Sequence, residues 1–141
     1  MGGEQLKALS IHPYYADKIL YGEKTIECRT WKTDYRGDIL ICSTAKKVEG
    51  TIPSHALCVV ELVDIKPFDR THLKGACMDV VPYDSYAWIL DNVRAIKPIP
   101  VKGKLSLWNF DGELEYFEPL DPDDDELDKR YHEVWEPLEY W

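Results

Sequence analysis

The chain has few of the features that mark membrane, secreted or metal-binding proteins. No apolar run approaches the roughly 20 residues of a membrane-spanning helix, and residues 1–5 lack the basic patch and apolar stretch of a secretory signal. The four cysteines form no CxxC or CxxxC pair, and the four histidines are dispersed. We therefore expect free thiols in a cytoplasmic protein, with no membrane association, metal site or cofactor.

An overall basic charge, the usual mark of a nucleic-acid-binding protein, is also missing, because the net charge is −9. The negative charge is concentrated in one segment of the chain. Residues 111–141 hold 2 basic and 13 acidic side chains, whereas residues 1–110 hold 15 basic and 13 acidic ones. Residues 18–47 contain seven basic and four acidic side chains. This local excess favours phosphate, but it is too small for tight non-specific binding to nucleic acid.

The 141 residues, 45% of them hydrophobic, are sufficient for one domain with a real core. A helix is predicted over 13–21, with Pro13 at its first position, Ser10 or His12 as its cap and Gly22 after its end. A shorter helix is expected near 70–74. Pro98 and Pro100 are expected to end the last long strand. Alternating apolar residues predict strands over 6–11 and 24–31, and apolar runs predict strands over 38–44 and 55–65. Another strand is expected over 85–96, and residues 101–110 are expected to form a turn and a strand around Gly103.

Four to six strands with one early helix indicate an α+β fold, a small mixed β-barrel over residues 1–110. Residues 111–141 form an acidic extension. Its residues 121–126 are expected to be a loop that leads into a helix, since acidic residues favour a helix N-terminus. The apolar side chains that follow recur at helical spacing and need a partner, so we expect an accessory helix packed on the barrel. They are Leu127, Tyr131, Val134, Trp135 and Leu138.

Residues 22–29 read Gly-Glu-Lys-Thr-Ile-Glu-Cys-Arg, which has the pattern GxKxxExR. Within the predicted strand 24–31, alternation places Glu27, Arg29 and Trp31 on one face. A carboxylate, a guanidinium and an indole would then form one row. Lys24 follows the glycine that ends the helix and stands at the start of this strand.

With its flanking segments, this motif resembles the ASCH family, domains homologous to a region of activating signal cointegrator 1. The resemblance spans roughly residues 9–110. It implies a PUA-like barrel with a binding cleft lined by the GxKxxExR segment and the first helix. Members of the family include RNA- and DNA-binding modules, ribonucleases, and a bacterial amidohydrolase that deacylates N4-acetylcytidine. The matching flanks are 12–16, Trp31 with 35–37, 45–47, and 99–104 with Leu107 and Trp108.

Each residue of this set also has a plainer interpretation. Lys24 would hold a phosphate or act as a base, or would be a solvated partner of Glu23 or Glu27. Arg29 would anchor an anion while Glu27 hydrogen-bonds a base edge or activates water, or the two would form an ion pair that orders the strand. His12 is expected to cap the helix. Candidates for stacking on a base are Trp31, Tyr14 and Tyr35, and candidates for phosphate contacts are Arg36, Lys46, Lys47, Lys102 and Lys104.

Three functions follow as hypotheses. The first is binding of RNA, a nucleotide or a modified nucleoside. The second is a metal-independent ribonuclease or nucleoside amidohydrolase that uses Lys24 and Glu27. The third is a protein-binding role for residues 111–141. The amidohydrolase branch of the family has a nucleophilic threonine three residues after its lysine and a distant glutamate. Glu27 occupies that threonine position, and residues 66–84 contain no Glu. The sequence therefore disfavours deacylation by that mechanism.

Overall fold

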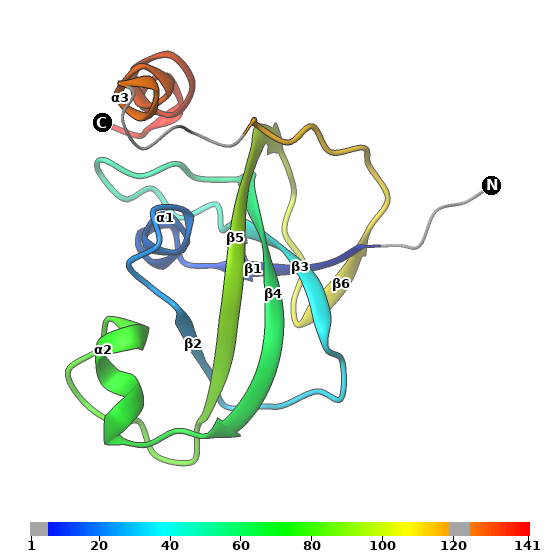
Figure 1. Ribbon diagram of the computed structural model, residues 1–141, viewed down its shortest axis with the longest axis vertical. Helices are drawn as coiled ribbons and strands as arrows, with labels where there is room; N and C mark the ends of the chain where they lie inside the picture. The colour runs from blue at the N-terminus through cyan, green and yellow to red at the C-terminus, as the bar shows by residue number, and fades with distance from the viewer. Residues whose placement is uncertain (1–5, 119–124) are drawn as a thin grey trace.

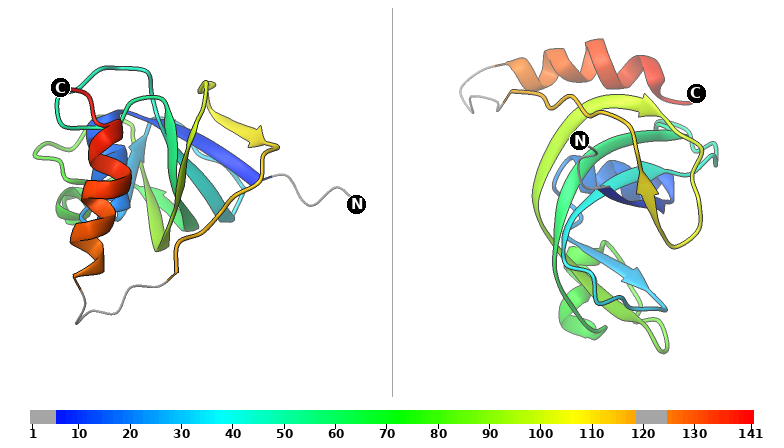
Figure 2. Two further views of the ribbon diagram at one scale, coloured as in Figure 1. Left: turned by 90° about the horizontal axis from the view of Figure 1, so that it is seen from above. Right: turned by 90° about the vertical axis from the view of Figure 1, so that its right-hand side faces the viewer.

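The computed structural model of the protein describes residues 6–118 and 125–141 (Figure 1). The fold is α+β, as predicted. Six strands form one strongly curled mixed sheet in the order β2-β5-β4-β3-β1-β6 (Figure 2). Within the described residues no strand pairing joins β2 to β6, so the predicted closure into a barrel is not shown. The strands are β1 Leu6–Ile11, β2 Ile26–Arg29, β3 Gly37–Ser43, β4 His55–Pro67, β5 Tyr86–Pro100 and β6 Leu107–Phe110.

The helix α1, Pro13–Leu20, connects β1 to the strands that follow. His12 is its cap, because the His12 Nδ1 atom accepts a hydrogen bond from the Tyr14 N–H at 3.1 Å. The chain then turns at Gly22, whose φ of 83° is a left-handed conformation that favours glycine. The predictions for this helix, its cap and its glycine are confirmed, and of the two candidate caps the structure uses His12. β1 and β3 pair in parallel.

The sheet is apolar on both faces. Along β3, Ile39 and Ile41 face the larger core, which includes α1, while Leu40 and Cys42 face a second core with Val59. This explains why β3 is a continuous apolar run instead of an alternating one. Cys42 and Cys58 are buried, and all four cysteines are unpaired. Among the described residues, no helix is both long and apolar enough to cross a membrane.

The prediction that Pro98 ends the last long strand was wrong, because β5 continues through it and ends only at Pro100. The ladder between β4 and β5 shifts register between Ala56 and Cys58, opposite the segment that contains Pro98. Pro100 is the last residue of the strand. Bulges and strand ends are the positions where a sheet tolerates a residue without an N–H group.

A short helical segment follows β4, as predicted. A 3-10 turn over Arg70–His72 leads into α2, Leu73–Ala76. Asp69 caps this turn, since its carboxylate accepts a hydrogen bond from the Thr71 N–H at 2.8 Å. Gly75 lies against Ile26, so α2 is held close to β2, and its carbonyl accepts a hydrogen bond from the Thr25 N–H at 2.8 Å.

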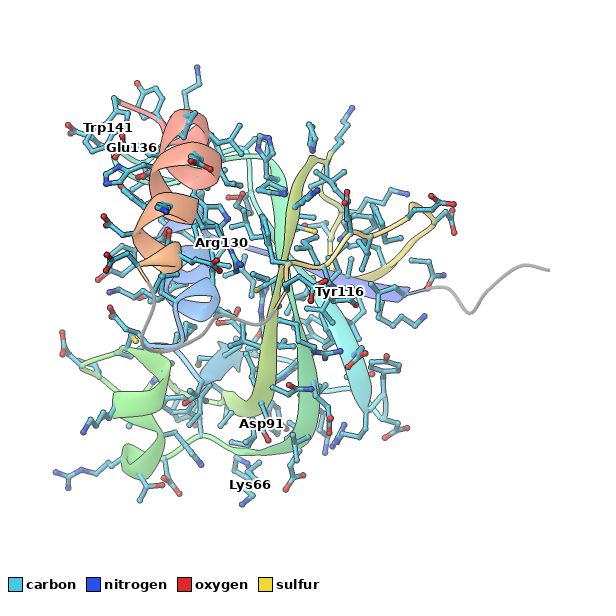
Figure 3. All side chains as sticks on the ribbon, turned by 45° about the horizontal axis from the view of Figure 1, so that its top comes forward. Lys66, Asp91, Tyr116, Arg130, Glu136 and Trp141 are labelled. Atoms are coloured by element: carbon cyan, nitrogen blue, oxygen red, sulfur yellow. The ribbon has the colours of Figure 1, made fainter. Side chains whose placement is uncertain are left out.

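The acidic extension contains a helical segment that packs on the body of the protein. It comprises α3, Glu126–Arg130, a π-turn over Tyr131–Trp135 and a 3-10 turn over Glu136–Leu138. Trp135 is 2% exposed and contacts the rings of Tyr21 and Phe117 edge-on. Figure 3 shows Arg130, Glu136 and Trp141 along this segment, and Figure 1 places the segment beside α1. The predicted accessory helix is confirmed; most of its predicted leading loop lies outside the described residues.

Candidate nucleotide-binding cleft

A cleft of about 1180 Å³ opens beside the GxKxxExR segment. One wall is made by the end of β1 and the start of α1, a second by β2 and a third by residues 101–106. Met78, Pro82 and Ser85, on the connection between α2 and β5, form a further side of the cleft. The segment singled out from the sequence therefore lines this cleft, together with parts of the chain far from it in sequence.

Lys24 is buried in the wall of the cleft, with 2% of its surface exposed. Its ammonium donates a hydrogen bond to the Ala76 carbonyl at 2.7 Å and lies 3.4 Å from Glu27 Oε1. The ring of Tyr15 covers it, with 4.6 Å between Nζ and the ring centroid. Main-chain hydrogen bonds from Lys24 to Lys18 and from Thr25 to Gly75 fix this position between α1 and α2. Lys24 is therefore held rigidly before any ligand binds.

Glu27 is also buried and joins two cations. Its Oε2 atom accepts a hydrogen bond from Arg29 Nε at 3.0 Å, and its Oε1 atom accepts one from the Cys28 N–H at 3.2 Å and faces Lys24. Both carboxylate oxygens are thus engaged within the protein. The Arg29 Nη2 group additionally donates to the Ser10 carbonyl at 2.9 Å. This leaves Arg29 Nη1 as the guanidinium nitrogen without a partner among the described residues, and Arg29 lines the cleft.

Burial changes the proton affinity of two groups in this cleft. Desolvation lowers the pKa of the Lys24 ammonium below its usual value, and the neighbouring Glu27 carboxylate opposes that change. A lowered pKa brings a lysine closer to the range in which it can exchange a proton. Desolvation also raises the pKa of the Cys28 thiol, which makes this cysteine a poor nucleophile.

The wall formed by residues 101–106 carries Lys102 and Lys104, both exposed. It packs closely on β1 through Gly103, where a Cβ atom would stand 2.5 Å from Ser10 Oγ. This hydroxyl is shielded from solvent and has no hydrogen-bond partner in the described part of the chain. Such a group costs about 1–3 kcal/mol until something satisfies it. Ser10 Oγ is therefore a buried, unsatisfied hydrogen-bonding group at the junction of two walls.

Strained backbone gathers around the same cleft. Among the described residues, five other than glycine have a left-handed φ, and four of them lie in or next to the walls of the cleft. Ser54 and Ser106 line the cleft, Cys77 precedes the lining residue Met78, and Asp84 precedes the lining residue Ser85. Such conformations cost about 1–3 kcal/mol each and concentrate at functional sites. This clustering of strain is typical of functional sites and is an observation independent of the motif.

The structure brings Lys24, Glu27 and Arg29 together, and His12 also lines the cleft. Trp31 is not part of this group. β2 ends at Arg29, so the alternation predicted to continue to Trp31 stops there. Trp31 packs edge-on against Trp88, with ring centroids 4.7 Å apart, and its carbonyl accepts a hydrogen bond from the Trp88 indole. The predicted row therefore lacks its aromatic member.

The other predicted contacts lie outside the cleft lining. Tyr14 is half-exposed on α1 beside Lys18. Arg36 donates hydrogen bonds to the carbonyls of Thr33 and Tyr35. Lys46 is exposed, and Lys47 stands over the ring of Tyr140. The remaining predicted aromatic, Tyr35, donates a hydrogen bond to the Asp38 carbonyl at 2.6 Å.

Sequence reasoning missed several parts of the site. Tyr15 was assigned to the apolar stripe of α1, yet its ring covers Lys24. Ser10 was considered as a cap and not as a cleft residue. The Ala76 carbonyl carries no side-chain signal at all. No described residue of 111–141 lines the cleft, so the predicted protein-binding role of that segment stands apart from it. No cluster of three or more potential metal ligands occurs in the part of the chain that is described.

Comparison with known proteins places this fold in a family. The ASCH domain matches residues 9–100, well over half of the chain. No curated protein sequence matches significantly. The crystal structure of ASCH from Zymomonas mobilis is similar, with a TM-score of 0.58 and 18% identity over 75% of this chain and 87% of that one. Two single-substitution variants of that protein match with TM-scores of 0.57, one at 18% identity over 76% of this chain and 91% of that one, the other at 17% over 78% and 91%. The chain therefore belongs to the ASCH family.

Proposed function

We propose that this ASCH protein binds RNA or a nucleotide-like ligand in the cleft around residues 22–29. ASCH domains are PUA-like, and RNA binding is the activity associated with them. The observation that carries the proposal is the buried Lys24–Glu27–Arg29 array in the wall of a cleft of about 1180 Å³. Glu27 positions the two cations, and its own oxygens are already used. The free N–H groups of Arg29, with Lys102 and Lys104 opposite, suit an acceptor-rich anion such as a phosphate.

The cleft offers more than charge. Met78, Pro82, Val101 and Leu105 supply apolar surface for the face of a base. Apolar walls with a few fixed polar groups are typical of small-molecule sites. Because the polar groups are held by hydrogen bonds to distant parts of the chain, binding requires little rearrangement of the cleft floor.

Calorimetric titration at low salt tests this function with single-stranded RNA, single-stranded DNA and modified nucleosides such as N4-acetylcytidine. Wild type is expected to bind at least one of them. Arg29→Ala is expected to weaken that binding at least tenfold. Arg36→Ala is the matched control, because it removes a guanidinium outside the cleft. Failure of every ligand to bind, or equal loss in the two variants, contradicts the proposal.

A second candidate is a metal-independent hydrolase acting on RNA or on an acylated nucleoside. The observation that favours it is the lowered pKa of Lys24 beside Glu27 in the cleft. A neutral Lys24 amine would accept a proton from water or from a ribose hydroxyl as that oxygen attacks, and would then return the proton to the leaving group. The amidohydrolase nucleophile of the family still has no counterpart, since Glu27 occupies its position.

This candidate is tested by incubating RNA and N4-acetylcytidine with wild type and with Lys24→Met, after circular dichroism has established that the variant is folded. Loss of turnover in Lys24→Met alone supports a proton-transfer role. Turnover that persists in the folded variant places the chemistry elsewhere.

A further inference from the structure

The distribution of charge around the cleft bounds the length of its ligand. The residues that line it include four cations, Lys24, Arg29, Lys102 and Lys104, and one carboxylate, Glu27. His12 also lines the cleft, and histidine is counted as neutral here, as in the net charge of the chain. The lining therefore carries +3. Since the whole chain carries −9, everything outside the lining carries −12.

The segments that bound the cleft continue into acidic stretches. Residues 105–118 follow the wall that carries Lys104, and they contain four carboxylates and no Lys or Arg. Residues 78–85 form a further side of the cleft and contain Asp79 and Asp84, both exposed, again with no cation. At physiological salt the Debye length is about 8 Å, so a phosphate that leaves the cleft past Met78 or Ser85 meets the exposed carboxylates of Asp79 and Asp84.

Cations elsewhere do not extend a track for a strand. Lys18 pairs with Glu23, Lys97 with Glu115, and Arg94 with Asp38 through two hydrogen bonds. Arg36 lies 3.9 Å from Asp64. Other cations follow lining residues in the sequence. Lys32 comes two residues after Thr30 and is held over the Tyr86 ring, and Lys46 and Lys47 follow Ala45, with Lys47 held over Tyr140.

Resting on the proposed function, we infer that the cleft engages a short stretch of about two or three nucleotides, and does not track a longer strand. A cavity of about 1180 Å³ exceeds the 300–1,000 Å³ usual for one small ligand, so it has room for more than one nucleotide. Its net charge of +3 matches about three phosphates. Beyond them, each added phosphate meets an acidic surface and gains nothing.

The apolar rim fits such a ligand. Leu105 is 94% exposed on the wall of residues 101–106, and Tyr83 is 90% exposed between the lining residues Pro82 and Ser85. An exposed aromatic ring can stack on a base at the end of a short segment, independently of its sequence. Recognition would then rest on a few phosphates and on base faces, with weak dependence on base identity.

A length series measured by calorimetry tests this footprint. The probes are uridine monophosphate and the 5′-phosphorylated di-, tri-, hexa- and dodeca-uridylates. The affinity is expected to rise up to three nucleotides. A longer strand can bind in several overlapping registers, and its affinity divided by the number of these registers is expected to stay constant. The slope of log K against log salt is expected to be about −2, since single strands give about −0.7 per phosphate contact.

Two double variants distinguish phosphate contacts made inside the cleft from contacts made outside it. Lys102→Ala/Lys104→Ala is expected to reduce the slope to about −0.7, because one contact remains. Lys46→Ala/Lys47→Ala is the matched control and is expected to leave the slope and the affinity unchanged. A register-corrected affinity that rises tenfold or more between three and twelve nucleotides overturns the short footprint, as does a dodecamer slope steeper than about −4. Absence of binding at every length overturns the proposed function itself.

Discussion

Glu27 and Arg29 are joined by two contacts to one oxygen atom: the Nε and Nη2 atoms of Arg29 lie 3.0 and 2.9 Å from Glu27 Oε2. The other carboxylate oxygen faces Lys24. Glu27 is thus the shared anion of a three-residue array in which Lys24 is almost completely buried. Its function in this arrangement is to hold two cations at the cleft.

Replacing Glu27 should therefore cost much more stability than replacing a surface carboxylate that also pairs with lysine. Glu27→Gln leaves the buried Lys24 charge without its anion, and we expect a loss of about 3 kcal/mol in the free energy of unfolding. Glu23→Gln breaks the exposed pair with Lys18 and should cost less than about 1 kcal/mol. Urea denaturation of both variants checks this. Similar losses in the two would mean that the array does not depend on Glu27.

Gly22 is expected to be sensitive to substitution for conformational reasons alone. Its φ is 83°, and a Cβ atom there would meet nothing within 4 Å. Gly22→Ala should cost about 1–2 kcal/mol, the usual penalty for a left-handed alanine. Gly22→Asn should cost less, because asparagine tolerates this conformation. Chemical denaturation distinguishes the two; equal losses would indicate a steric cause instead.

The stability of the protein should depend on the protonation of Asp17. Burial, and secondarily the Glu139 carboxylate, raise the pKa of Asp17 to about 6. Between about pH 4 and pH 6 the folded state then binds a proton that the unfolded state does not, so this group stabilises the fold as the pH falls through 6. Above pH 6 the buried charge is a cost.

Asp17→Asn removes that cost. The variant should be more stable than wild type at pH 7.5, and the difference should shrink steadily as the pH is lowered from 6 to 4. Urea denaturation at several pH values gives the comparison. Glu139→Gln serves as the control, since it should reduce part of the difference at pH 7.5 by removing one neighbouring charge. A difference that does not vary with pH would rule out this origin.

The docking of the C-terminal helical segment should depend on Trp135. This side chain is 2% exposed, and its ring meets those of Tyr21 and Phe117. Trp135→Ala should destabilise the protein by about 3–5 kcal/mol. Leu127 lies on the same segment but is 50% exposed, so Leu127→Ala should change the stability by about 0.5 kcal/mol or less. A small effect of Trp135→Ala in thermal denaturation would show that the segment contributes little to the fold.

Much of the fold was predictable because its signals are local. The apolar alternation of residues 6–11, the proline that begins α1 and the glycine that follows it are all read within a few residues. The same alternation correctly placed Glu27 and Arg29 on one face of β2. It failed at Trp31 because nothing local indicates that β2 ends at Arg29 and that Trp88 accommodates the indole. Pro98 and Pro100 are likewise tolerated only because of the bulge and the end of the ladder with β4.

By itself, the sequence determined the order of the elements, the resemblance to the ASCH pattern and the place of Glu27 and Arg29 on one face of a strand. The tertiary structure decided what surrounds them. The burial of Lys24 depends on a carbonyl 52 residues away and on the ring of Tyr15, and the wall of residues 101–106 reaches Ser10 from the far end of the chain. Periodicity reports only which face a side chain takes. Which groups contact that face depends on packing between distant segments, and this packing places the GxKxxExR segment in the wall of a cleft.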